Sequence, residues 1–245
     1  MRLFHFGKSD APLVGAFHPA HQTVRSSHGV LLCAPFGDEA IRAHRPMRRL
    51  ADQLALIGVP TLRFDYFGTG DSSGGCEEVT LDRWVEDVEV AAKTLSEMAD
   101  IEQLVLIGVR LGATVACKAS AALSPYGLVL WEPLLSGSDY WAEALEGGPG
   151  QHRQAGGFPV PDILYQEVAT PDRQAMDTLP AQKLLVIGDE AAKAHYVDAA
   201  PHVIWAPPPD SFEWTTDDAM NSFRVPARSI DLIVDMVATW RGGGV

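Results

Sequence analysis

Positively charged side chains are scarce in this sequence. Its 245 residues hold 19 Lys and Arg against 32 Asp and Glu, which gives a formal net charge of −13. Non-specific nucleic-acid binding requires clustered positive charge, so the composition argues against a nucleic-acid partner, and an anionic membrane surface would repel the chain for the same reason. The basic residues gather only around Arg42, Arg45, Arg48 and Arg49. Their spacing places much of this group on one helix face, which we interpret as a solvated surface rather than a phosphate site.

Cysteine is also rare, and no apolar run is long enough to cross a bilayer. The three cysteines, Cys33, Cys76 and Cys117, are an odd number without the spacing of a metal site. This favours a reduced, cytoplasmic setting. The chain begins without the zones of a signal peptide, and we expect no metal and no cofactor. Cys117 is expected in the core, whereas Cys33 closes a strand near the presumed site and is the one thiol of catalytic interest.

Apolar runs typical of strands alternate with helical segments along the chain. The pattern predicts strands at 3–6, 13–18, 29–34, 59–65, 103–107, 128–131, 183–187 and 202–206. It predicts helices at 47–57, from Thr80 onward, at 111–123 and at 226–240. Such alternation indicates an α/β fold with a mostly parallel eight-stranded sheet and helices on both faces. A hydrophobic fraction of 47% is enough for one domain over residues 1–245.

Residues 136–178 interrupt this alternation. They are rich in glycine and proline and contain only short amphipathic segments, at 139–145 and 161–168. We expect a lid or cap insertion above the carboxyl edge of the sheet, because long connections in compact domains are commonly functional.

The most informative motif lacks the residue expected at its centre. Residues 108–112 read Gly-Val-Arg-Leu-Gly directly after a buried run, which is the frame of the G-x-S-x-G nucleophile elbow. Arg110 stands in place of the serine, and a guanidinium has no lone pair with which to attack a carbonyl. In hydrolases that carry this elbow, the catalytic histidine follows the last strand. In this sequence no histidine follows His202. We therefore predict that the chain has no Ser-His-Asp triad.

The order of the elements, the elbow after the fifth strand and the late insertion resemble the α/β-hydrolase fold over nearly the whole chain. Within that superfamily the sequence resembles a serine-aminopeptidase-like branch with a Gly-x-Arg-Leu-Gly elbow, some members of which are described as exosortase-system-associated hydrolases. The matching stretches are 34–39, 65–72, 108–113 and 131–137. The resemblance implies a role in polysaccharide or secondary-metabolite biosynthesis. The name of the branch does not establish hydrolysis, because function must be argued from the site.

Two interpretations of Arg110 are compatible with each other. In the first, Arg110 forms a buried ion pair with Glu39, from the loop on one side, or with Glu132, which ends the neighbouring strand. In the second, its planar fork binds a substrate carboxylate, phosphate or enolate, aided by the helix amino terminus at Leu111. A glutamate that is not neutralised by pairing would serve as the general base.

Further candidates follow from their positions in the predicted fold. The backbone N–H groups of Phe36 and Leu111 match the donors of an oxyanion hole. Tyr140 in the insertion and Trp214 in the last loop are expected to contact the substrate. Asp189, after the seventh strand, fits the acid position, although without serine and histidine it has nothing to orient.

The leading hypothesis is an atypical enzyme that performs a non-hydrolytic reaction, namely elimination, isomerisation or cyclisation, on a small anionic metabolite. One alternative is a hydrolase or thioesterase with an unconventional nucleophile, such as Cys33 or a water activated by a carboxylate. Another is a non-catalytic protein that binds a ligand in a degenerate site. A carboxylate with a raised pKa favours the first, an exposed thiolate the second, and a closed Arg110–Glu132–Glu39 network the third. The sequence leaves a homodimer open.

Overall fold

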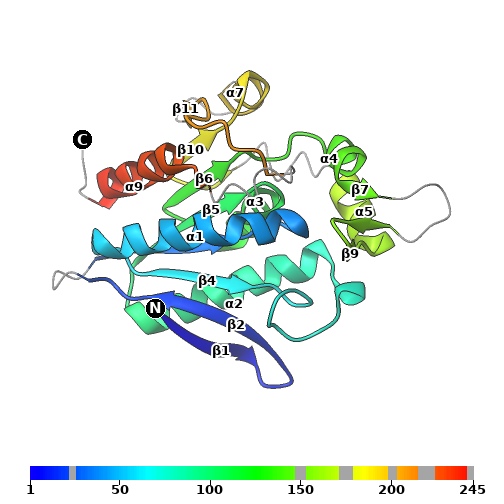
Figure 1. Ribbon diagram of the computed structural model, residues 1–245. Helices are drawn as coiled ribbons and strands as arrows, with labels where there is room; N and C mark the ends of the chain where they lie inside the picture. Colours follow the sequence, from blue (N-terminus) through cyan, green and yellow to red (C-terminus); the bar gives the residue numbers. More distant parts are fainter. Residues whose placement is uncertain (22–25, 147–152, 171–178, 198–202, 215–223, 242–245) are drawn as a thin grey trace.

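The centre of the molecule is an eight-stranded sheet with the order β1-β2-β4-β3-β5-β6-β10-β11 (Figure 1). The computed structural model describes the chain except residues 22–25, 147–152, 171–178, 198–202, 215–223 and 242–245. β2 runs antiparallel to β1 and β4, and the other neighbouring strands are parallel, as the sequence predicts. The strands are β1 (Arg2–Lys8), β2 (Ala11–His18), β3 (His28–Cys33), β4 (Thr61–Asp65), β5 (Gln103–Val109), β6 (Gly127–Trp131), β10 (Lys183–Ile187) and β11 (Val203–Ala206).

Helices cover both faces of this sheet, with α1 and α9 on one face and α2 and α3 on the other (Figure 1). Within the described ranges, the helices outside the insertion are α1 (Asp38–Leu56), the 3-10 turn η1 (Cys76–Glu78), α2 (Leu81–Ala99), α3 (Leu111–Leu123), α7 (Glu190–Val197) and α9 (Ala227–Arg241). α3 has the predicted bounds, but α1 begins at Asp38 rather than at 47. The helix accommodates Pro46 in its interior, and two acidic residues in its first turn favour the earlier start. No helix among the described residues is long and apolar enough to cross a bilayer.

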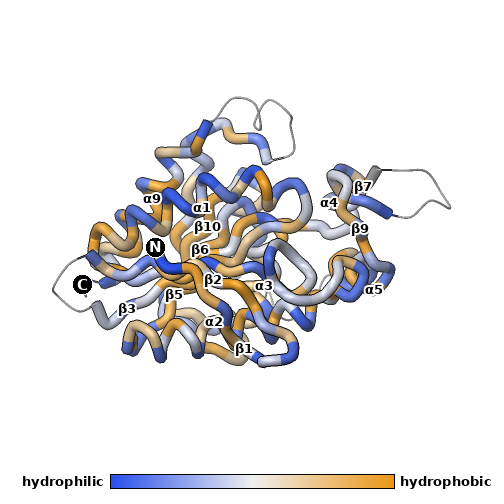
Figure 2. Tube along the Cα trace, turned by 60° about the horizontal axis from the view of Figure 1, so that its bottom comes forward, coloured by the Kyte–Doolittle hydropathy of each residue, from blue (hydrophilic) through white to orange (hydrophobic). Residues whose placement is uncertain are grey.

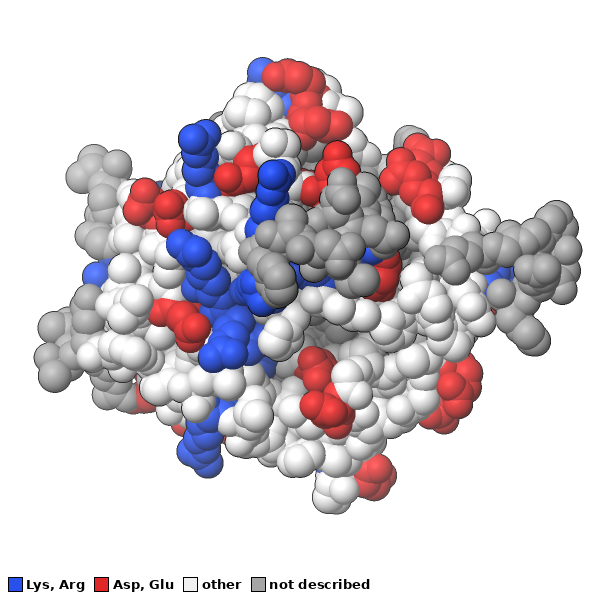
Figure 3. Space-filling model, in the orientation of Figure 1, with Lys and Arg blue, Asp and Glu red and all other residues white. Residues whose placement is uncertain are grey.

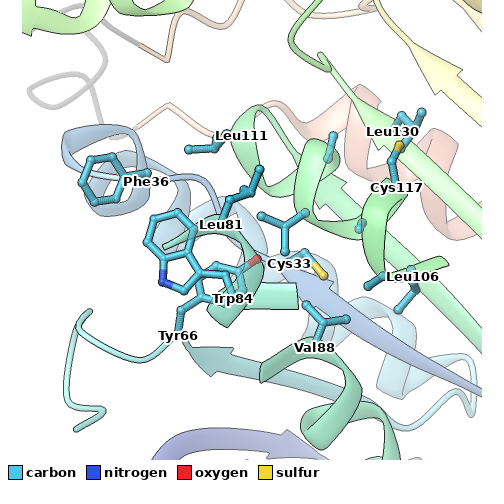
Figure 4. Packing of buried hydrophobic residues seen from close by; sticks show 14 of the residues in the cluster. Cys33, Phe36, Tyr66, Leu81, Trp84, Val88, Leu106, Leu111, Cys117 and Leu130 are labelled. Atoms are coloured by element: carbon cyan, nitrogen blue, oxygen red, sulfur yellow. The ribbon is translucent and has the colours of Figure 1, made fainter. Parts of the chain in front are cut away.

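The central strands are apolar on both faces because helices bury each of them. In β5, Leu106 packs into the layer under α2 and α3, while Val105 and Ile107 pack into the layer under α1 and α9. Figure 2 shows the same distribution, with hydrophobic residues concentrated in the inner strands. Near the carboxyl edge the first layer turns aromatic, and the rings of Tyr66 and Trp84 stack at 5.1 Å between centroids (Figure 4).

The amino terminus of α2 has the predicted side-chain cap. The Thr80 hydroxyl accepts a hydrogen bond from the backbone N–H of Arg83 at 3.0 Å. We expect Thr80→Ala to lower the free energy of unfolding by about 1 kcal/mol, because an N–H group of the first turn then loses its partner. Urea unfolding of both proteins measures this. Thr80→Ser, which keeps the hydroxyl, is expected to retain most of the stability, and equal losses in the two variants would contradict the capping role.

The insertion forms a small unit beyond the carboxyl edge of the sheet (Figure 1). Three two-residue strands pair antiparallel in the order β7-β8-β9. The unit consists of α4 (Gly137–Ala144), β7 (Leu145–Glu146), β8 (Gln154–Ala155), β9 (Phe158–Pro159) and α5 (Asp162–Ala169). Gly156 lies against the start of α1, since a Cβ on it would approach the Cβ of Asp38 to 2.3 Å. The insertion therefore packs on the first turn of the helix that carries Glu39.

Candidate functional site

Arg110 occupies a tight elbow between β5 and α3. Its backbone angles are φ 52° and ψ −121°, a region that non-glycine residues rarely adopt. The turn is held by two backbone hydrogen bonds, from the Arg110 N–H to the Trp131 carbonyl at 3.0 Å and from the Ala113 N–H to the Arg110 carbonyl at 2.9 Å. Gly112 permits the close approach of the preceding loop, because a Cβ there would lie 2.3 Å from the Cys33 carbonyl oxygen. The backbone of a nucleophile elbow is thus present, and it lifts a guanidinium above the sheet.

Arg110 forms an ion pair with Glu39, which lies in the first turn of α1 rather than in the preceding loop. Its Nε donates to Glu39 Oε1 at 3.0 Å, and the side chains are 18% and 2% exposed. Among the described residues, Glu39 is the one carboxylate that pairs with Arg110, and the terminal guanidinium nitrogens donate to none of them. Burial raises the pKa of Glu39, and the charge and hydrogen bond of Arg110 offset this only in part. Glu39 Oε2 is buried without a hydrogen-bond partner in the described part of the chain.

Glu132 follows β6 and provides a second carboxyl group beside Arg110. Its φ is 48°, and its backbone N–H donates to the Ile187 carbonyl at 2.7 Å. Burial raises the pKa of Glu132 to about 7, even though the indole N–H of Trp214 and the charge of Arg110 act to lower it. Desolvation outweighs both attractions, so the group exchanges its proton near neutral pH.

Two tryptophans surround the Glu132 side. The rings of Trp131 and Trp214 meet edge to face at 5.4 Å between centroids, and both residues are buried. Both indole N–H groups act to lower the pKa of Glu132, but neither makes a hydrogen bond of normal geometry to a described residue. The two indole donors therefore contribute polar N–H groups to the surroundings of the Glu132 carboxyl group.

Tyr140 connects the insertion to the elbow. It lies on α4, is buried, and its ring centroid is 5.9 Å from the Arg110 Cζ, within the range of a cation–π contact. Burial, together with the negative charge of Glu39, raises the pKa of Tyr140 well above its usual value. Tyr140 therefore remains a neutral phenol beside the guanidinium.

One predicted oxyanion donor lies at the elbow and the other on the loop after β3. Leu111 is the first residue of α3, and Phe36 lies between β3 and α1. Among the described groups, neither backbone N–H donates a hydrogen bond, so both remain suitable for an anion. The Phe36 side chain has a packing role, and its ring lies 5.5 Å from that of Trp84 between centroids (Figure 4).

Arg42 contradicts the expectation that the arginines of α1 form only a solvated face. Its side chain is 5% exposed, pairs with Asp38 one turn earlier, and donates from Nη1 to the Trp214 carbonyl at 3.0 Å. It also acts to lower the pKa of Glu39. The i,i+4 spacing of Asp38 and Arg42 is typical of an ion pair on one helix face. The burial of the Arg42 side chain depends on the distant loop that carries Trp214, which the spacing does not indicate.

Three other polar candidates lie apart from this group. Asp189 is exposed, and its Oδ1 accepts from the Ala192 N–H at 2.8 Å, so it caps the start of α7. The Asp65 Oδ2 accepts from the Asp71 N–H at 3.1 Å and serves the glycine-rich loop. His195 is exposed on α7. His202 falls outside the described residues, and within those residues no group of three or more His, Cys, Asp or Glu side chains is placed to bind a metal ion.

Cys33 does not have the properties expected of a nucleophile. It is fully buried in the layer under α2 and α3, and burial raises the pKa of its thiol to about 12. Cys117 lies in the same layer, as predicted, and its pKa is raised to about 12 for the same reason. The structure therefore contradicts the expectation that Cys33 is a thiol of catalytic interest, because helices cover the end of its strand.

The comparisons with known proteins identify the fold. No family model matches the chain, and no curated protein matches it in sequence. Among solved structures, it is similar to DcsB in complex with its substrate analogue (TM-score 0.72, 14% identity, 99% of each chain covered). It is also similar to Est1E from Butyrivibrio proteoclasticus with bound ferulic acid (0.69, 12%, 96% of this chain and 99% of that one).

A third similar structure is XC6422 from Xanthomonas campestris, described as an α/β serine hydrolase without a lid (0.65, 16%, 100% of this chain and 96% of that one). These likenesses confirm the α/β-hydrolase fold expected from the sequence. At 12–16% identity they establish the fold alone.

Proposed function

We propose that this chain is an atypical α/β-hydrolase-fold enzyme that binds a small anionic metabolite on Arg110 and catalyses a non-hydrolytic reaction through proton transfer at Glu132. The observation that carries the proposal is the pair of groups at the elbow. A guanidinium stands where the nucleophile would be, and beside it a half-buried carboxyl group has a pKa of about 7. The first group is suited to anchor an anion and the second to act as acid and base.

The division of roles follows from the contacts. Arg110 uses Nε to hold Glu39, and its terminal nitrogens are the atoms with which a planar fork binds a carboxylate or enolate. The Glu132 carboxylate removes a proton from the carbon next to the substrate's carbonyl or carboxylate group. The electron pair of that C–H bond moves into the carbonyl, and the resulting enolate oxygen is stabilised by Arg110 and the amides of Phe36 and Leu111.

The enolate then has two outcomes that need no further reagent. In a substrate with a β,γ double bond, the enolate is conjugated with that bond, and return of the proton from Glu132 to the γ-carbon completes an isomerisation that moves the double bond. Loss of a leaving group from the neighbouring carbon completes an elimination, and the leaving group takes the proton. Neither outcome requires a serine or histidine, in agreement with the sequence of the elbow.

The Gly-x-Arg-Leu-Gly motif supports assignment to the serine-aminopeptidase-like branch, and the composition supports a cytoplasmic protein.

Binding of the anion is tested first with malonate and inorganic phosphate as probes. We expect Arg110→Gln to weaken the affinity for the better probe by at least about tenfold, because a charge-assisted hydrogen-bond pair is lost. Titration calorimetry measures the affinity. Arg228→Gln, at an exposed position on α9, is the matched control and is expected to leave the affinity unchanged. Unchanged affinity in Arg110→Gln would show that Arg110 serves only as the structural partner of Glu39.

Proton transfer is tested with the unmodified protein and a panel of small 2-oxo and 3-oxo carboxylates in D₂O. The proposal predicts enzyme-dependent deuterium incorporation next to the carbonyl, followed by NMR, and its loss in Glu132→Gln. Exchange that persists in Glu132→Gln would remove Glu132 from the mechanism. Saturable binding on Arg110 without exchange or turnover of any panel member would favour a ligand-binding protein instead.

A further inference from the structure

A cavity separate from the Arg110 group opens beside α1. It has a volume of about 640 Å³, within the range of about 300–1,000 Å³ typical of small-molecule sites. Its floor is formed by β2 and β4, and one wall by α1. Neither Arg110 nor the two glutamates of the elbow line it.

One end of the cavity is apolar. Phe36, Trp84 and Phe158 close it at the carboxyl edge of the sheet, and Val14 and Met47 continue the apolar surface along β2 and α1. The mouth is lined by large hydrophobic side chains that are left in solvent, with Ile41 56% and Leu3 66% exposed. An apolar group that entered here would remove this surface from water, so the lining favours a hydrocarbon chain or ring.

The other end is cationic. Arg63 on β4 and Arg48 on α1 both line the cavity, and Arg48 Nε also lies 3.9 Å from Asp52 Oδ2 in an exposed ion pair. The Arg63 guanidinium forms no ion pair with a carboxylate among the described residues. Burial lowers the pKa of Arg63, Arg48 lowers it further, and the charges of Asp52 and Asp65 oppose this only in part. An anion at this position would supply the missing compensation.

A hydrogen bond to a buried histidine also holds the Arg63 side chain in place. Its Nε donates to His18 Nε2 at 3.3 Å, and His18 Nδ1 bonds the Asp52 carboxylate at 2.8 Å. Since His18 is only 1% exposed, this chain of bonds fixes the stem of the guanidinium against α1. One terminal nitrogen, Nη2, makes only a weak contact to the Met1 Sδ at 3.6 Å, which a carboxylate ligand would replace.

Two acidic residues, Asp65 and Asp71, also line the cavity, and Asp65 offsets part of the Arg63 charge. Asp65 lies two residues after Arg63 on the same face of β4, and its Oδ2 is bonded to the backbone of Asp71. Both belong to the end nearer the glycine-rich loop. Figure 3 shows Lys and Arg side chains gathered over α1 and the strands beside it, in a protein whose net charge is −13. This local excess favours the approach of an anion to this face.

We propose that this cavity binds a free amphipathic carboxylate, with its carboxylate on Arg63 and Arg48 and its apolar chain directed toward Phe36 and Trp84. The proposal is independent of the reaction at Arg110, because different side chains carry it. It adds to the protein a second ligand site, which neither Arg110 nor the two glutamates of the elbow line.

Titration calorimetry with decanoate tests the proposal, with decanol as the uncharged comparison. We expect saturable binding of decanoate and affinity at least about tenfold weaker for decanol and for decanoate with Arg63→Gln. Ile41→Asp, at an exposed position of the mouth, is expected to weaken binding because it places a like charge beside the ligand. Arg49→Gln, exposed on the same helix but outside the cavity, is the control and is expected to leave affinity unchanged.

The outcomes separate the two sites. Loss of decanoate binding in Arg110→Gln with retention in Arg63→Gln would overturn the proposal, because the probe would then occupy the elbow. Equal affinity for decanoate and decanol, or no saturable binding, would overturn it as well. Thermal unfolding of each variant shows whether it is folded, and Ile41→Asp keeps the test decisive if Arg63→Gln is not.

Discussion

Glu132→Gln is expected to make the protein more stable than the wild type at pH 8, by about 2–3 kcal/mol. The ordinary glutamate pKa of 4.5 rises to about 7 at this position because burial disfavours the carboxylate. A shift of this size corresponds to about 3 kcal/mol, and we reduce it slightly because some solvent reaches this half-buried residue. Glutamine has a similar shape and carries no charge, so the variant avoids the cost of ionisation.

The pH dependence fixes the sign of this effect. Below pH 4.5 the carboxyl is protonated in both the folded and the unfolded chain, so ionisation makes no contribution. Between pH 4.5 and about 7 the unfolded chain loses the proton while the folded chain retains it, and wild-type stability falls as the pH rises. The stability difference between Glu132→Gln and the wild type is therefore expected to grow from pH 5 to pH 8.

Urea unfolding at a series of pH values measures this difference. Glu143→Gln removes a carboxyl at an exposed position of α4 and serves as the matched control for the loss of one glutamate side chain. A pH-independent difference for Glu132→Gln would mean that Glu132 has an ordinary pKa, and its role as acid and base at neutral pH would then be lost. A stabilising substitution that abolishes proton transfer would indicate that the carboxyl is retained for chemistry rather than for stability.

The main architecture is predictable because the central strands of the sheet are buried on both faces. β5 and β6 read as nearly continuous apolar runs, while α2, which precedes β5, shows one apolar stripe. The elbow is also visible in the sequence, because Gly108 and Gly112 flank the turn at the required spacing. By contrast, the two-residue strands of the insertion are too short to produce a periodic pattern.

The environment of the site is less predictable because it depends on contacts between distant segments. The pairing of Arg110 with Glu39 was one of two alternatives, and only the position of α1 decides it. Arg42 reads as a surface residue until the loop that carries Trp214 covers it. The cavity beside α1 corresponds to no sequence motif, because its lining residues come from separate segments, among them β2, β4 and α1, which only the fold brings together.

Gly112→Ala is expected to lower the free energy of unfolding by about 3 kcal/mol or more. A Cβ at this position would lie 2.3 Å from the carbonyl oxygen of Cys33 and 2.4 Å from that of Ala34. Both obstacles are backbone atoms at the end of β3, so the contact cannot be relieved by turning a flexible side chain. The loop toward Phe36 would have to move, which would separate the two predicted oxyanion donors.

Gly157→Ala provides the matched control for this prediction. Gly157 has a φ of 81°, and nothing lies within 4 Å of the Cβ that alanine would add. Its substitution is therefore expected to cost only the conformational penalty, about 1 kcal/mol. Urea unfolding compares the two variants. Equal losses of unfolding free energy in the two variants would mean that the loop after β3 does not pack closely on the elbow. A much larger loss for Gly112→Ala would show that the tight turn is maintained around Arg110, although no nucleophile requires it.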